Sequence, residues 1–245
     1  NDATYVNFLF GLTALTVYIV FWILIYKKEK IKWVWVSIHN IKKRFIENFQ
    51  FFISSIAGHV SVHGGLIILA SFVNNTILGE FALAQKIALL MRMVPVFFTQ
   101  AILQNATVLF KKDKIEFNSY VNRIFITGLS ITFGMGLIVI LLSKWIIFLL
   151  AGSFVIYSET ILKILAFIPF LSMLNFNNMV KILVDEKKYL LTRATWITAI
   201  IMLVFATIGS YYYGGYGLSI ALVLTEIMSF IVYSKLLMKN KYESA

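Results

Sequence analysis

The stretch FALAQKIALLMRMVPVFFTQAILQNATVLF, residues 81–110, is the most informative of the apolar segments in this chain. It is longer than the roughly 20 residues that an α-helix needs to cross about 30 Å of hydrocarbon. On a helical projection its polar side chains gather within an arc of roughly 140°, and the opposite arc is apolar. The polar residues are Gln85, Lys86, Arg92, Thr99, Gln100, Gln104 and Thr107. The stretch therefore predicts a transmembrane helix with one polar face.

The composition of the whole chain agrees with a membrane-embedded fold. Of its 245 residues, 60% are hydrophobic and 13% are charged, whereas a soluble domain carries about 45–50% apolar and about 25% charged residues. A membrane barrel would show alternating segments of about ten residues, and none is visible. We therefore predict an all-α integral membrane protein with about seven transmembrane helices. The predicted spans are 5–26, 50–73, 81–110, 122–150, 160–184, 190–212 and 215–238.

Lysine and arginine residues are distributed unequally between the connecting segments. The basic segments are 27–50, 111–123, 187–193 and 235–241, and the loops without Lys or Arg are 74–79, 151–158 and 210–214. By the positive-inside rule the basic segments and the C-terminus are cytoplasmic, and the N-terminus is outside. The formal net charge of +11 is therefore interpreted as a signal of membrane orientation, and no nucleic-acid partner is predicted.

The spans and the charge pattern also divide the chain into two predicted regions. Residues 1–49 hold the first span and a basic cytoplasmic loop, and residues 50–245 hold six helices and a cytoplasmic tail. The loop mixes Trp33, Trp35, Ile38 and Ile41 with its charges, which is typical of an amphipathic helix on the lipid surface. Because residue 1 is not Met and an apolar stretch begins almost at once, we expect the sequence to be part of a longer chain.

Ionisable residues within the spans are candidates for function, because a charge in hydrocarbon costs several kcal/mol unless it meets a partner or a cavity. Arg92 lies about halfway along its span, and it is either the cationic lining of a hydrated cavity or a packing partner of an acid or carbonyl. Glu226 is either a functional acid or a structural partner of Arg92 or a serine. Further polar residues share a side of the fifth and seventh spans. They are Ser172, Asn175 and Asn178, and Ser219, Ser229 and Tyr233.

The sequence offers little for catalysis or for a cofactor. His59 and His63 share a helix face, but no Asp, Glu or Cys accompanies them, so lumen lining or hydrogen bonding is favoured over metal binding. The chain contains no cysteine and no GxxxxGK[ST] phosphate loop. Because nucleophile–base sets and large loops are also missing from the pattern, we predict a non-enzyme without cofactor or metal.

Three motifs carry a resemblance to a known family. Residues 78–87, LGEFALAQKI, are similar to a G-x-[YF]-x-x-A-x-[KR]-[IV] pattern that opens a helix after a short external loop. Residues 161–170, ILKILAFIPF, look like the family's tenth span, and residues 214–221, GGYGLSIA, with Thr225 and Glu226, resemble the opening of its last span. The family is that of bacterial polysaccharide flippases, the O-antigen and capsule repeat-unit transporters of the multidrug/oligosaccharidyl-lipid/polysaccharide superfamily.

The resemblance implies the second half of a twelve-span transporter in the bacterial cytoplasmic (inner) membrane. The first span matches the family's sixth, and the other six match its C-terminal lobe. The implied function is alternating-access translocation of polyprenyl-diphosphate-linked oligosaccharide, with membrane lipid and a missing N-terminal lobe or second copy as partners. The implied substrate-binding residues are Lys86, Arg92, Gln100, Gln104, Asn175 and Asn178, and the implied ion-coupling residues are Glu226, His59 and His63.

Three other functions remain open from the sequence. A drug or small-solute exporter of the same superfamily would bind an organic cation, and the basic Lys86 and Arg92 argue against that. A polytopic oligosaccharide polymerase or transferase would need a sizeable loop with acids, and the longest loop, 27–50, is basic. An inactive truncated remnant is the third.

Overall fold

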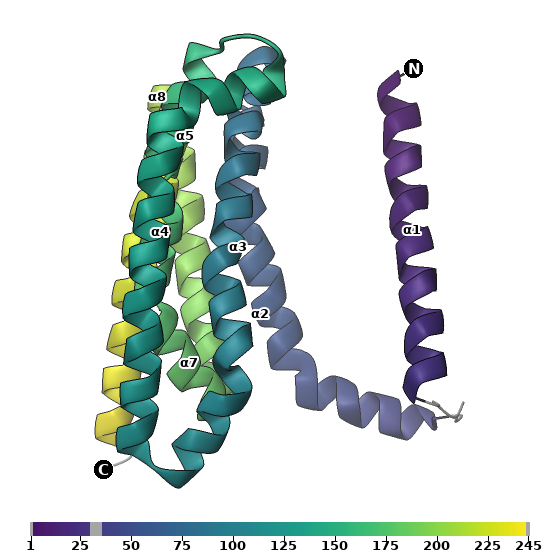
Figure 1. Ribbon diagram of the computed structural model, residues 1–245, viewed down its shortest axis with the longest axis vertical. Coiled ribbons are helices and arrows are strands. Elements are labelled where there is room, and N and C mark those ends of the chain that lie inside the picture. The colour runs from purple at the N-terminus through teal and green to yellow at the C-terminus, as the bar shows by residue number, and fades with distance from the viewer. Residues whose placement is uncertain (1, 30–35, 244–245) are drawn as a thin grey trace. The chain divides into compact units, whose positions relative to one another are not determined.

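The computed structural model describes residues 2–29 and 36–243, and its elements there are all helices (Figure 1). Contacts divide the chain into two compact units, Asn1–Glu47 (unit 1) and Asn48–Ala245 (unit 2), where the sequence placed a boundary after residue 49. The elements are α1 (Asp2–Glu29), α2 (Ile38–Ala70), α3 (Asn75–Lys112), α4 (Lys114–Ala151), α5 (Ile156–Leu165), α6 (Ile168–Leu174), α7 (Phe176–Val184) and α8 (Lys188–Glu243).

Six helical stretches in the described residues are long and apolar enough to cross a membrane. They are Gly11–Lys28, Asn48–Ala70, Asn75–Lys112, Lys114–Ala151, Ile156–Val184 and Lys188–Lys239. The prediction of an all-helical chain with several long apolar helices is thereby confirmed. Of the amphipathic segment predicted at 27–50, Trp33 and Trp35 lie outside the described residues, and α2 begins at Ile38.

The longest stretch, α8, is a helical hairpin that reverses at Gly214. Gly214 has φ 56° and ψ −135°, which L side chains rarely adopt, so glycine is required at the reversal. The two halves are antiparallel, because the Thr195 and Tyr233 hydroxyls lie 3.0 Å apart and Gly209 packs on Gly217. A Cβ on Gly217 would overlap the Gly209 carbonyl. The hairpin halves correspond to the predicted spans 190–212 and 215–238.

The predicted span 160–184 is a broken helix. It divides into α5, α6 and α7, with one interruption at Ala166 and Phe167, just before Pro169, and another at Asn175. Pro169 lies at the start of α6, where its missing N–H costs little. Asn175 joins α6 to α7, so its polar side chain lies at a helix interruption inside unit 2.

The core of unit 2 has three apolar clusters. The smallest contains Ile182, Leu190, Ala194 and Tyr233, and the two larger ones lie toward opposite ends of α3. One of the larger clusters contains Phe81, Leu165 and Leu218, and the other contains Ile102, Phe117 and Val180. On α3 the first cluster ends at Met91 and the second begins at Ile102, and on α5–α7 the first ends at Ile168 and the second begins at Met173. The segments between the clusters contain Arg92, Thr99, Ser172, Glu226 and Ser229, which we call the polar layer.

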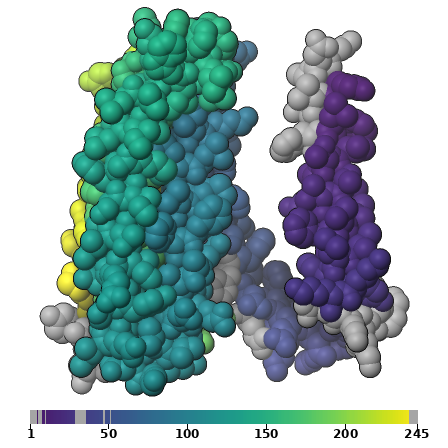
Figure 2. Space-filling view, in the orientation of Figure 1, coloured from purple at the N-terminus to yellow at the C-terminus, as the bar shows by residue number. Residues whose placement is uncertain are grey.

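The outer surface of unit 2 is apolar where a membrane would meet it. α4 faces the viewer in Figure 2 and carries large exposed apolar side chains along its length. They include Leu137, Ile138, Leu141, Leu142, Trp145 and Leu149. In water such a surface would be an aggregation site, whereas lipid tails solvate it.

The hairpin makes a prediction about stability. Gly217→Ala should push the halves of α8 apart and lower the free energy of unfolding by about 1–3 kcal/mol, because the added Cβ has no room. Gly134→Ala in α4 is the matched control, since a Cβ there meets no atom within 4 Å. Thermal unfolding in detergent measures both variants. Equal stability of the two would contradict the close approach of Gly209 and Gly217.

Candidate functional site

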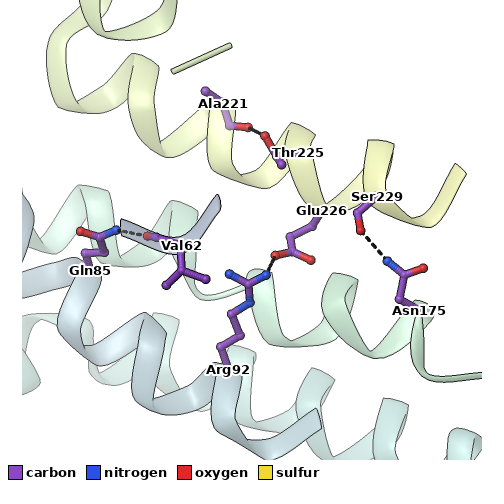
Figure 3. A network of polar contacts seen from close by, with 8 residues as sticks. All are labelled: Val62, Gln85, Arg92, Asn175, Ala221, Thr225, Glu226 and Ser229. Carbon is purple, nitrogen blue, oxygen red and sulfur yellow. Dashed lines mark hydrogen bonds and ion pairs between the residues drawn. The ribbon is translucent and has the colours of Figure 1, made fainter. Parts of the chain in front are cut away.

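The polar layer contains an ion pair between α3 and the second half of α8. Arg92 Nη2 lies 2.5 Å from Glu226 Oε1, and the two side chains point toward one another in Figure 3. The Glu226 side chain is 8% exposed, and that of Arg92 is 28% exposed. Taking a carboxylate out of water costs several kcal/mol unless it is paired, so Arg92 stabilises Glu226 at this depth.

The partial exposure of Arg92 leaves it able to contact a ligand. A guanidinium carries several N–H donors in one plane and can bind a phosphate or carboxylate through two of them. Glu226 Oε1 accepts from one end of this group, at Nη2. Arg92 therefore has two roles in the polar layer. It is the counter-ion of Glu226, and it lines the neighbouring cavities.

Three cavities of unit 2 meet at Arg92. The largest has a volume of about 330 Å³ and lies between α2, α3, α7 and α8. A second, of about 150 Å³, lies between α3, α6, α7 and α8, and a third, of about 20 Å³, reaches Gln85. The largest cavity is rich in hydroxyl groups, which are those of Ser54, Ser55, Ser61, Thr195, Thr198, Ser229 and Tyr233.

Amide groups extend the polar layer on either side of the ion pair (Figure 3). Asn175 Nδ2 donates to Ser229 Oγ at 2.9 Å, and Gln85 Nε2 donates to the Val62 carbonyl at 3.3 Å. Asn175 Oδ1 is buried and has no hydrogen-bond partner among the described residues. Because Asn175 lines the second cavity, this oxygen can accept a hydrogen bond from a ligand or a water there.

The structure brings together only part of the site predicted from the sequence. Arg92, Asn175 and Glu226 line one continuous polar region. Asn178 lies elsewhere, where its Nδ2 donates to Ser234 Oγ at 2.9 Å beside a cavity at the C-terminal end of α8. The polar arc of α3 has two edges that differ in burial. Gln85 is buried on one edge, whereas three residues of the other edge are exposed. These exposed residues are Lys86, Gln100 and Gln104.

The two histidines of α2 lie apart from the ion pair. His59 and His63 are exposed and stack with ring centroids 6.0 Å apart, and neither lines the cavities at Arg92. The described part of the chain has no cluster of three or more His, Cys, Asp or Glu that could hold a metal ion. Of the residues proposed for ion coupling, Glu226 alone is therefore in the polar layer.

Several hydroxyl residues of the site were missed from the sequence. Thr195 and Thr198 lie one turn apart in the first half of α8, and Ser54 and Ser61 lie two turns apart on α2. Ser54 Oγ is 2.8 Å from Thr192 Oγ1, which ties α2 to α8 at the edge of the largest cavity. The helical spacing of these hydroxyls could have indicated a shared polar face. Each hydroxyl alone, however, is typical of a side chain that donates to a backbone carbonyl of its own helix.

The ion pair predicts strong coupling between two helices. Arg92→Gln leaves the buried Glu226 carboxylate unpaired and should lower the free energy of unfolding by about 3–5 kcal/mol, whereas Glu226→Gln leaves the partly exposed Arg92 unpaired and should cost less. The exchange Arg92→Glu with Glu226→Arg should restore most of this loss. Lys163→Gln with Glu159→Gln is the control, because that pair is 2.6 Å apart at the surface and should contribute less than about 1 kcal/mol.

A double-mutant cycle on unfolding in detergent measures the coupling. Additive effects of the two substitutions in the polar layer, with no recovery in the exchanged variant, would contradict the pairing.

Comparison with known proteins found no match for this chain. No protein-family model matches the chain, no curated protein matches it, and no solved structure matches it. The described residues establish an all-helical chain with several apolar helices suited to a membrane, and they contain a buried ion pair beside polar cavities.

Proposed function

We propose that the chain forms one lobe of a polysaccharide flippase that moves polyprenyl-diphosphate-linked oligosaccharide from the cytoplasmic to the outer leaflet of a bacterial cytoplasmic membrane. One observation carries the proposal: a partly exposed arginine lies between two apolar clusters, beside cavities of about 330 and 150 Å³. A cation at this depth gives a binding position for an anion that has to cross an apolar layer. The motifs quoted above point to the same substrate class.

The ion pair supplies a mechanism for releasing and binding the diphosphate. When Arg92 and Glu226 are both ionised, the pair is neutral and tolerated in the interior. If Arg92 turns to a diphosphate, the Glu226 carboxylate loses its counter-ion in a medium of low dielectric constant. Uptake of a proton by Glu226 removes this cost. The proposal therefore couples diphosphate binding at Arg92 to protonation of Glu226.

The hydroxyl and amide groups that line the cavities at Arg92 suit a sugar. Hydroxyl groups of Ser61, Thr198 and Tyr233 line the largest of the three cavities at Arg92, and they can both donate to and accept from sugar hydroxyls. The unpartnered Asn175 Oδ1 adds a buried acceptor in the second cavity. The polyprenyl tail needs no polar partner and can remain against the apolar outer surface of the helices.

The proposal includes seven spans and an orientation. α1 to α4 give four spans, the broken helix α5–α7 gives one, and the hairpin of α8 gives two. Within unit 2, the α3–α4 turn, α7 and the C-terminal end of α8 lie at the same end (Figure 1). That end carries Lys111, Lys112, Lys187 and Lys188, so we assign it to the cytoplasm.

A lobe of this kind needs a second set of helices opposite its polar surface, which we call the facing wall. A volume of about 330 Å³ is at the lower end for a drug-sized ligand and is smaller than an oligosaccharide with its diphosphate. The exposed Lys86, Gln100 and Gln104 on α3 would meet lipid at a cost unless polar groups cover them. We propose that a second copy or a further lobe supplies this wall and that the two walls open alternately to each side.

Glu226 favours one alternative function. A buried carboxylate beside a cavity could bind an organic cation, as in a small-solute exporter, if Arg92 moved away from it. The two functions require opposite ligand charges at the same pair. A binding experiment with both kinds of ligand therefore separates them.

The proposed function predicts a charge-specific binding site. The full chain in lipid nanodiscs should bind a short-chain polyprenyl-diphosphate oligosaccharide, and Arg92→Ala should weaken binding by about tenfold or more, because a hydrogen bond to a charged group is lost. Arg92→Lys should retain part of the affinity, since an ammonium lacks the planar fork of a guanidinium. Lys111→Ala is the control, because Lys111 is an exposed cation in the last turn of the same helix and lines none of the cavities at Arg92, so this variant should bind nearly as the parent does.

Isothermal titration gives the affinities, and thermal unfolding shows that each variant is folded. Unchanged binding by folded Arg92→Ala would rule out the diphosphate site. Binding of a lipophilic organic cation that depends on Glu226 would favour the exporter.

A further inference from the structure

Unit 2 has a second polar cavity, at the end of the helix lobe where α8 ends. Its volume is about 410 Å³, and its walls come from the α3–α4 turn, α7, the α7–α8 turn and the last turns of α8. Arg92 and Glu226 are not among its lining residues. The cavity is therefore separate from the polar layer, and an inference about it does not depend on the proposed function.

The charge of this cavity is positive. Lys114, Lys181 and Lys187 line it together with one acid, Asp185. Lys187 Nζ lies 2.6 Å from Asp185 Oδ2, so this acid is already neutralised by a neighbour. Lys114 Nζ lies over the ring of Phe110, 5.9 Å from its centroid, and Lys181 is exposed. Two ammonium groups thus remain for an anion.

Three acids of the adjoining turns, Asp113, Glu116 and Glu186, are not among the residues that line the cavity. Asp113 caps α4, where its Oδ1 accepts from the backbone N–H groups of Ile115 and Glu116 at 2.7 and 3.2 Å. The Glu116 side chain is exposed and is not part of the lining. The cap also holds Lys114, the first residue of α4, at the edge of the cavity.

The remaining lining is apolar except for one hydrogen-bonded pair and Asn118, whose Nδ2 donates to the Lys114 carbonyl at 2.7 Å. Phe117 packs edge-on against Phe110 with centroids 5.2 Å apart, and Leu237 and Met238 form another part of the wall. Met238 is 56% exposed, so apolar surface continues from the cavity to the outside of the helices. Asn178 Nδ2 donates to Ser234 Oγ, and the Ser234 hydroxyl can still donate to a ligand.

We infer that this cavity binds the headgroup phosphate of an anionic phospholipid. Lys114 and Lys181 would contact the phosphate, Ser234 would donate to one of its oxygens or to the glycerol, and the acyl chains would follow the apolar surface beyond Met238. Basic cavities between helices at the level of the headgroups are suited to such lipids. The volume of about 410 Å³ is within the range of small-molecule sites. A soluble phosphate would leave the apolar wall unused.

The test compares two charge-matched double variants of the full chain. Lys114→Gln with Lys181→Gln removes the two ammonium groups of the cavity. Lys111→Gln with Lys112→Gln removes the same charge from exposed residues that do not line it. Each purified protein in neutral detergent is titrated with phosphatidylglycerol, phosphatidylcholine or glycerol 3-phosphate, and bound lipid is measured by native mass spectrometry.

The parent protein should retain phosphatidylglycerol in preference to phosphatidylcholine. A lysine beside an anionic headgroup contributes about fivefold in affinity, so the loss of Lys114 and Lys181 should weaken phosphatidylglycerol binding by about 25-fold. The control pair should change it by less than about fivefold. Equal losses in the two double variants would overturn the inference, because the effect would then be general surface charge. Binding of glycerol 3-phosphate as tight as that of phosphatidylglycerol, or no preference over phosphatidylcholine, would also overturn it.

Discussion

The contact between Arg92 and Glu226 places opposite charges 2.5 Å apart between two apolar clusters of the helix lobe. Neither charge is tolerable alone at this depth, so the pair constrains the rotation and the relative height of α3 and α8. The neighbouring hydrogen bond between Asn175 and Ser229 adds the α6–α7 interruption to the same layer. Three elements are thus held in register by polar contacts, while lipid-facing apolar surface imposes no register of its own.

Two departures from continuous helix make this layer possible. The interruption at Asn175 places a buried side-chain amide at the junction of α6 and α7, where it donates to Ser229 and lines the second cavity. The reversal at Gly214 returns α8 so that Glu226 and Ser229 reach α3 and Asn175, while Thr195 reaches Tyr233. Both features constrain helix packing, and both position polar side chains. These side chains line the cavities at Arg92.

Much of this arrangement could be predicted from the sequence, because hydrophobic length and the positions of charges report directly on it. The long apolar helices were available in this way, and a structural pair of Arg92 and Glu226 was one of the predicted alternatives. The polar arc of α3 shows the limit. Helical projection groups Lys86, Gln100 and Gln104 with Gln85 and Arg92, but only neighbouring helices decide which edge of the arc turns inward. The structure turns the Gln85 edge inward and leaves the others exposed.

The same limit explains Asn178 and the histidines. Asn175 and Asn178 both donate to serines of α8, but Asn178 lies about one turn further along, where it meets Ser234 and a different cavity. His59 and His63 form a helical pair in the sequence, yet the inward face of α2 is the one with Ser54 and Ser61. Long-range packing of this kind leaves no periodic signal in one chain.

We propose that the polar layer around Arg92 is a hydrated cavity between two dry apolar layers. Cysteine substitutions report this hydration without background labelling, because the chain has no cysteine of its own. Ser172→Cys and Ser229→Cys place a thiol in the layer, while Ala166→Cys and Met173→Cys place one in the fully buried apolar clusters. A hydrophilic, membrane-impermeant thiol reagent should modify the first two at least about tenfold faster than the last two, since an accessible thiol reacts and a buried one is inert. Equal protection of all four thiols in the folded protein would show a dry polar layer, and it would reduce the Arg92–Glu226 pair to a structural contact.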